Sequence, residues 1–185
     1  LFAILLAGML AFGAAACGQV QPTEEAEQVL MPEDMTAMAA PIDSLARCML
    51  ENDLTYAPDD PEFFWMALYY FTGGYAMGHA AVEMTGSAQI KVPRQVMQEH
   101  ATALFADYDD LLELPADMEG RITYDESMDA YFVMPGDIGL SETKLTNFGK
   151  IADGYVLTAE LWSTDEDANL IAAWDVTLVD NAYAD

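Results

Sequence analysis

The spacing of apolar residues changes near residue 121, and this change limits the folds open to the chain. Before it, apolar residues recur every three or four positions, as on one face of a helix. After it, they alternate with polar residues, as in strands that bury one face. Four segments are expected to pair as two hairpins: 121–124 with 130–134, and 144–152 with 155–164. Asp153-Gly154 is a strong signal for the second turn, and a last strand from Leu170 to Leu178 completes an antiparallel meander.

Three helices are expected before the strands. Residues 41–51 place Ile42, Leu45 and Met49 near one face of the first. The second begins with Asp60 as a capping residue, and its apolar run ends at Gly73 and Gly74. A short strand at 89–92 precedes the third helix, which begins at Pro93 and extends to about residue 106.

This order of elements predicts an α+β fold. About three helices would pack on one face of a curved antiparallel meander sheet of about five to six strands. The order resembles the NTF2-like or cystatin-like cone, in which a curved sheet wraps around a helix. That resemblance rests on the order of elements, and no residue motif accompanies it.

The first sixteen residues contain no charge and are rich in Leu, Ala, Ile, Phe and Met. Such a run is shorter than the roughly 20 residues that a spanning helix needs. It is typical of the apolar core of a secretory signal, which small residues follow at the cleavage point. Residue 1 is Leu, so we expect the sequence to begin inside the signal.

The run ends in Ala14-Ala15-Ala16-Cys17-Gly18, which resembles the lipobox of bacterial lipoproteins, although Ala14 stands where Leu is usual. The resemblance covers the first 18 residues. It implies that Cys17 is lipidated and becomes the new N-terminus, so that acyl chains hold the protein to the outside of a membrane. The alternative is an ordinary cleaved signal followed by an incidental cysteine.

Three regions follow from this interpretation. Residues 1–16 are the signal, residues 17–41 hold the lipidated cysteine and an acidic linker, and residues 42–185 form one α+β domain. The folded part resembles uncharacterised lipoprotein domains of Firmicutes in its acidic, Tyr-rich strands. That likeness implies no particular activity.

The chain carries 32 Asp and Glu residues against 6 Lys and Arg, a formal net charge of −26. Nucleic-acid backbones and anionic lipid headgroups would repel such a protein, so neither is an expected partner. Apolar residues make up 53% of the chain, enough for a core. We therefore interpret the charge as a source of solubility, with adaptation to high salt or a cationic partner as alternatives.

No catalytic motif is present in the sequence. It contains no GxSxG, P-loop, GxGxxG, HExxH or CxxC pattern. His79 and His100 are expected to have structural or surface roles rather than to act as ligands or bases. Cys48 is expected to be a small buried apolar side chain, with a reactive thiol as the alternative.

Aromatic side chains are the candidates for ligand contact. These candidates are Trp65, Tyr69, Tyr75, Trp162 and Trp174. Tyr and Trp combine a large apolar surface with one polar group, which suits a binding pocket. Core packing is the competing explanation, because aromatic residues also dominate protein interiors.

Calcium is the one candidate cofactor. Asp165, Asp167 and Asn169 alternate as in the start of a calcium loop. Leu170 stands where the loop needs glycine, and Val176 where it needs the closing glutamate, so this is not an EF-hand. A solvated turn is the competing explanation.

These observations predict a lipid-anchored, non-enzymatic binding or interaction domain of the bacterial cell envelope, facing outward. Its partners would be the membrane, through the anchor, and a small ligand or another envelope protein, but no nucleic acid. The alternative is a carboxylate-dependent envelope hydrolase, which would need two acids facing each other across a cleft.

Overall fold

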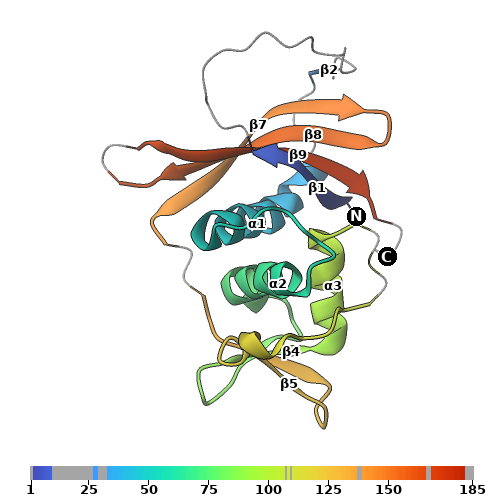
Figure 1. Cartoon of the computed structure of the whole chain (residues 1–185), viewed down its shortest axis with the longest axis vertical. Coiled ribbons are helices and arrows are strands. Elements are labelled where there is room, and N and C mark those ends of the chain that lie inside the picture. The colour runs from blue at the N-terminus through green and yellow to red at the C-terminus, as the bar shows by residue number, and fades with distance from the viewer. Residues whose placement is uncertain are drawn as a thin grey trace.

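A computed structural model describes residues 2–9, 27–28, 33–106, 108, 110–136, 139–165 and 168–181. Three helices lie between two antiparallel sheets, as Figure 1 shows. Helix α1 packs beneath the larger sheet, and helices α2 and α3 lie between α1 and the smaller sheet. The α+β class, the antiparallel pairing and the three predicted helices are confirmed.

The larger sheet has the strand order β1-β9-β8-β7-β2. Its strands are β1 (Phe2–Met9), β2 (Glu27–Gln28), β7 (Ser141–Ile151), β8 (Gly154–Ser163) and β9 (Leu170–Asp180). The predicted β7–β8 hairpin is confirmed, but its turn is Ala152-Asp153, one residue before Asp153-Gly154, since Ile151 pairs with Gly154. Leu157, Ala159 and Leu161 of β8 point into the core, as the alternation predicts.

The smaller sheet has the order β3-β4-β6-β5. Its strands are β3 (Glu83–Met84), β4 (Ile90–Pro93), β5 (Ile122–Asp125) and β6 (Ala130–Val133). Apart from the two-residue strands β2 and β3, the sheets have four and three strands. The β5–β6 hairpin is as predicted, but it pairs with β4 rather than with the later strands. A single meander of five to six strands is therefore wrong.

Consecutive strands β6 and β7 belong to different sheets, so the chain leaves the smaller sheet after β6. Just after β6, the backbone at Gly136 contacts α2 at Gly73. The N–H of Gly136 donates to the carbonyl of Gly73 at 3.1 Å. A Cβ atom on Gly73 would lie 2.9 Å from the Gly136 nitrogen, so a side chain there would block this contact. We predicted that Gly73 would end the helix, whereas α2 continues through it to Tyr75.

The helices begin and end close to where the sequence predicts them. They are α1 (Ala39–Asn52), α2 (Pro61–Tyr75) and α3 (Arg94–Leu104). The Asp60 cap is confirmed, because its carboxylate accepts a hydrogen bond from the Glu62 N–H at 2.9 Å. Short 3-10 helices complete the fold: η1 (Glu33–Met38), η2 (Ala76–Gly78) and η3 (Ala116–Met118). The domain boundary expected at residue 42 falls inside α1, and Met35 of η1 is buried.

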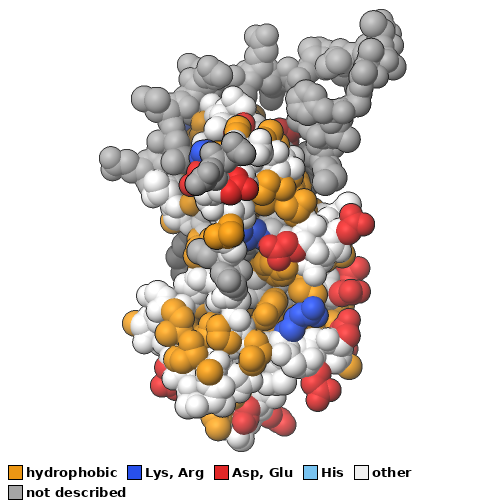
Figure 2. Space-filling model, turned by 90° about the vertical axis from the view of Figure 1, so that its left-hand side faces the viewer, with side chains coloured by type: hydrophobic (Ala, Val, Ile, Leu, Met, Phe, Trp, Pro, Cys, Tyr) orange, Lys and Arg blue, Asp and Glu red, His pale blue; other side chains and the backbone are white. Residues whose placement is uncertain are grey.

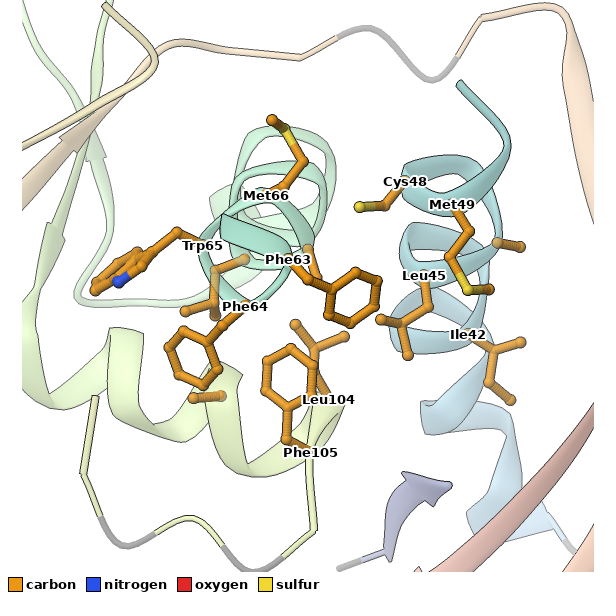
Figure 3. Close-up of a cluster of buried hydrophobic side chains, with 14 of the residues drawn as sticks. Ile42, Leu45, Cys48, Met49, Phe63, Phe64, Trp65, Met66, Leu104 and Phe105 are labelled. Atoms are coloured by element: carbon orange, nitrogen blue, oxygen red, sulfur yellow. The ribbon is translucent and has the colours of Figure 1, made fainter. Parts of the chain in front are cut away.

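Aromatic and aliphatic side chains fill the space between α1, α2 and α3. Figure 3 shows Phe63 of α2 pointing toward Leu45 of α1, and Phe64 beside Phe105. The Phe64 and Phe105 rings are stacked, with centroids 4.8 Å apart. Cys48 also points toward α2 and is fully buried, which confirms its expected place in the core. Burial raises the pKa of its thiol to about 12, so the thiol is inert near neutral pH.

Residues 2–9, which lie within the predicted signal, form the strand β1 at the edge of the larger sheet. This strand runs antiparallel to β9, and Phe2 pairs with Asp180. Cys17 and the rest of the lipobox lie outside the described residues. No helix in the described part of the chain is both long and apolar enough to cross a membrane.

Candidate functional site

The structure separates the five aromatic residues predicted to contact a ligand. Trp65 is fully buried in α2, and its indole N–H donates to the carbonyls of Leu112 and Glu113 at 3.1 Å. Trp174 is also buried, on the core side of β9. Both side chains therefore contribute to packing in this structure.

Trp162 lies on the opposite side of the larger sheet, away from the helices. Its indole N–H donates to the Glu160 carboxylate at 3.0 Å. The Lys144 ammonium group lies 5.2 Å from the centre of its ring, within the range of a cation–π contact. Trp162 is thus already engaged by neighbours on its own face of the sheet.

Tyr69 and Tyr75 line one cavity of about 140 Å³ between α1 and α2. We call this cavity the tyrosine pocket. Besides these two residues, its walls are formed chiefly by Asp43, Arg47, Glu51 and Tyr70. Pockets for drug-sized ligands measure roughly 300–1,000 Å³, so this one would admit a small molecule or one end of a larger one.

A buried ion pair forms one wall of the tyrosine pocket. Asp43 and Arg47 are the only buried Asp, Glu, Lys or Arg residues in the described part of the chain. They lie one helical turn apart in α1, and Arg47 Nε donates to Asp43 Oδ2 at 2.7 Å. The remaining guanidinium nitrogens reach β7, where Nη1 donates to the Ser141 hydroxyl at 2.6 Å and Nη2 to its carbonyl at 2.7 Å.

The Asp43 carboxylate has further donors on two other elements. The Tyr75 hydroxyl, at the end of α2, donates to Oδ2 at 2.5 Å. The Thr143 hydroxyl, on β7, donates to Oδ1 at 2.5 Å. Each oxygen therefore accepts at least one hydrogen bond, as a buried carboxylate requires. The pKa of Tyr75 is raised, first by burial and then by its bond to Asp43, so this phenol stays protonated at neutral pH.

Glu51 forms the opposite side of the tyrosine pocket, where α1 nears its end. The Tyr70 hydroxyl donates to Glu51 Oε2 at 2.7 Å and accepts from Asn52 Nδ2 at 3.1 Å. Burial and this bond raise the pKa of Tyr70. Within the described residues no basic side chain pairs with Glu51, and Tyr70 is its only hydrogen-bond donor. The walls therefore carry one uncompensated negative charge.

Sequence reasoning identified Tyr69 and Tyr75 but missed the charged half of the site. The missed residues are Asp43, Arg47 and Glu51. A signal was present: Asp43 and Arg47 are four residues apart on a helix, and Arg47 lies among apolar residues in a chain with few cations. Thr143 had no such signal, because only the tertiary fold brings β7 to α1.

A larger concavity of about 510 Å³ lies over β7, β8 and β9 near the β7–β8 turn. The described residues around it include no aromatic side chain, and its charged groups are two carboxylates, Asp153 and Asp175. A site usually needs a few convergent polar groups against an apolar wall to orient its ligand. The tyrosine pocket meets this requirement better.

The predicted calcium loop is only partly described. Asp165 Oδ1 accepts a hydrogen bond from the Ser163 hydroxyl at 2.7 Å, and the Asn169 N–H donates to that hydroxyl at 2.9 Å. Asp167 lies outside the described residues. In the ranges that are described, no three His, Cys, Asp or Glu side chains come together as a metal would require.

Each histidine has a different environment. His100 is buried between α2 and α3, where its Nδ1 lies 3.3 Å from the Thr72 hydroxyl and its ring meets the Phe71 ring edge to face. Burial lowers the pKa of His100 to about 4. His79 is exposed, and its Nε2 lies 3.6 Å from the Glu99 carboxylate.

Comparison with known proteins suggests no family for this chain. No family model matches it, and neither a curated protein nor a solved structure shows significant similarity to it. Its function must therefore be argued from the residues and the geometry.

Proposed function

We propose that this protein is a non-enzymatic, lipid-anchored binding domain on the outer side of a bacterial membrane, and that its ligand enters the tyrosine pocket. The anchor rests on the order of apolar run, small residues and Cys17 in the sequence. The observation that carries the binding role is the pocket itself, in which exposed Glu51 and half-buried tyrosines surround a buried, fully bonded ion pair. Such a rigid polar wall can orient a ligand at little entropic cost.

Lipidation would alter the larger sheet. Cleavage before Cys17 removes residues 1–16 and with them the strand β1. The mature domain would then have β9 as the edge of that sheet. The tyrosine pocket would keep the walls that the structure describes, because those residues lie between Asp43 and Gly136.

Mass spectrometry of the protein from the envelope of its own cells tests the anchor. We expect the chain to begin at Cys17 and to carry acyl chains through a thioether. An unmodified sulfur at Cys17, or recovery of the protein from the cytosol, would refute this half of the proposal.

A ligand screen tests the pocket. Neutral, anionic and cationic small molecules would be screened against the full chain by ligand-observed NMR. We expect at least one to bind, and to lose binding in Tyr69→Leu but not in Tyr124→Leu, a change on exposed β5. If no compound loses binding in Tyr69→Leu, the pocket is not the binding site. Affinity capture from envelope extract, with and without calcium, tests the alternative that the ligand is another envelope protein.

The rival function, a carboxylate-dependent envelope hydrolase, receives less support from this pocket. Its two acids, Asp43 and Glu51, both lie on α1, and eight residues of helix separate their backbones by about 12 Å. A glycosidase pair holds its carboxyl groups roughly 5–9.5 Å apart across the substrate. Asp43 also already accepts three hydrogen bonds. Envelope glycan cleavage that disappears in Glu51→Gln would restore the hydrolase as the better proposal.

The resemblance of the fold to the NTF2-like or cystatin-like cone also stays a prediction.

A further inference from the structure

The charge in and around the tyrosine pocket restricts what it can bind. Among the described residues in its walls Arg47 is the only basic one, and Asp43 together with Ser141 engages its guanidinium. An anionic ligand would find no free cation there. It would also approach a chain with a net charge of −26, whose charged side chains are mostly acidic, as on the face in Figure 2.

Glu51 is the charge in these walls that has no ionic partner. Its side chain is exposed, and the one donor to it within the described residues, the Tyr70 hydroxyl, bonds to Oε2. The other carboxylate oxygen remains able to accept a hydrogen bond or to attract a positive charge. The neighbouring acid, Asp43, is neutralised by Arg47 and cannot serve in the same way.

Aromatic rings share the lining of the pocket with this carboxylate. Tyr69 and Tyr70 follow each other in α2, with ring centroids 5.9 Å apart and ring planes at 89°. Tyr75 adds a third phenol to the lining. Aromatic rings that line a pocket are the usual receptor for alkylammonium groups, because the electron-rich ring faces attract a cation that water holds weakly.

On these grounds we infer that the tyrosine pocket selects a small organic cation, such as an alkylammonium group, through Glu51 and the rings of Tyr69 and Tyr70. This inference rests on the proposed function and specifies its ligand class. The volume of about 140 Å³ suits a single headgroup. A metal ion would gain less, because it requires several oxygen ligands and cannot use the rings.

Choline and its neutral isostere 3,3-dimethylbutan-1-ol are the probes, because they differ in charge but hardly in shape. Binding of each to the full chain would be measured by titration calorimetry and by NMR. We expect choline to bind at least about tenfold more tightly than the alcohol. Equal binding of the two would overturn the inference, and so would failure of choline to bind.

Variants assign the effect to the pocket. Glu51→Gln should weaken choline binding about tenfold and leave the alcohol unchanged, while Glu62→Gln, an exposed change at the start of α2, should alter neither. Tyr69→Leu should weaken choline binding, whereas Tyr69→Phe should retain most of it. Unchanged choline binding in Glu51→Gln would also overturn the inference.

Failure here is distinguishable from failure of the proposed function. If neutral or anionic compounds bind in the pocket and choline does not, the proposed binding role is supported and the inferred selectivity for a cation is wrong. If no compound of any charge binds in the pocket, the inference and the binding role fall together. Mass spectrometry of Cys17 tests the lipid anchor independently of both binding results.

Discussion

The phenol of Tyr75 donates to the buried carboxylate of Asp43 across 2.5 Å, and this bond joins the end of α2 to the start of α1. Asp43 also accepts from Arg47 and, through its other oxygen, from Thr143 on β7. One side chain thus links two helices and the larger sheet. Because a charged acceptor loses its hydration on burial, each of these donors contributes to stability.

Tyr75→Phe removes the phenol donor and keeps the ring. We expect it to lower the free energy of unfolding by about 1–2 kcal/mol, because a buried carboxylate loses a hydrogen bond. Tyr124→Phe is the matched control, since Tyr124 donates to Asp129 at 2.7 Å on the exposed β5–β6 hairpin. Urea denaturation would measure both variants. An equal loss in the two would show that burial of Asp43 does not matter.

Arg47→Met leaves Asp43 buried without its cation. We expect a loss of about 3–5 kcal/mol, because the uncompensated charge cannot be hydrated. The double variant Asp43→Asn with Arg47→Met should recover part of this loss, since it buries no charge. The control is Arg94→Met, which breaks an exposed pair with Asp110 and should cost less than about 1 kcal/mol. If Asp43→Asn gives no recovery when added to Arg47→Met, the ion pair is not the cause of the loss.

Gly154→Ala tests the β7–β8 turn. A Cβ atom on Gly154 would lie 1.9 Å from the Leu178 carbonyl oxygen, and the glycine has a φ of 154°. We expect a loss of about 3 kcal/mol or more, because the β9 backbone would have to move. Gly86→Ala should have little effect, since nothing lies within 4 Å of its Cβ position. Thermal denaturation distinguishes the two, and equal melting temperatures would contradict the close approach.

His100 should make the fold sensitive to acid. Its pKa is about 4 in the fold against 6.5 in the unfolded chain, so between these values the unfolded chain binds more protons. Stability should therefore fall as the pH drops from about 6.5 to about 4, by up to about 3 kcal/mol from this residue. His100→Gln should flatten this part of the curve relative to His79→Gln, a change at the exposed histidine. Parallel curves for the two variants would argue against a buried, neutral His100.

The net charge of −26 should make stability depend on salt. Self-repulsion among exposed carboxylates is screened as ionic strength rises. We expect the melting temperature to increase between about 10 mM and about 1 M sodium chloride, and calcium to raise it further by binding carboxylates. A melting temperature that stays flat across this range would show that the charges are too widely spaced to repel one another.

Local sequence signals predicted the three helices and the strands β4 to β9. Asp60 predicts the start of α2, Asp153-Gly154 predicts the β7–β8 hairpin, and the alternation from Leu170 predicts β9, all within a few residues of where they lie. These signals work because capping, turn geometry and periodicity depend on neighbours close in sequence. Gly73 shows their limit. Glycine is typical of a helix end, but Gly73 lies inside α2. The backbone at Gly136 packs so closely against it that a side chain would not fit.

By itself, then, the sequence determined the three helices and the strands β4 to β9, but not β1, β2 or β3. It also determined that the chain is strongly acidic. Only the tertiary structure decided that the β5–β6 hairpin joins β4 through β6, and that Trp65 and Trp174 fill the core while Tyr69 and Tyr75 border a cavity. It alone brought Thr143 to Asp43, a hundred residues apart. The reason is that the periodic spacing of apolar residues specifies which face of an element is buried, but not which other element packs against that face. That choice depends on packing over the whole chain.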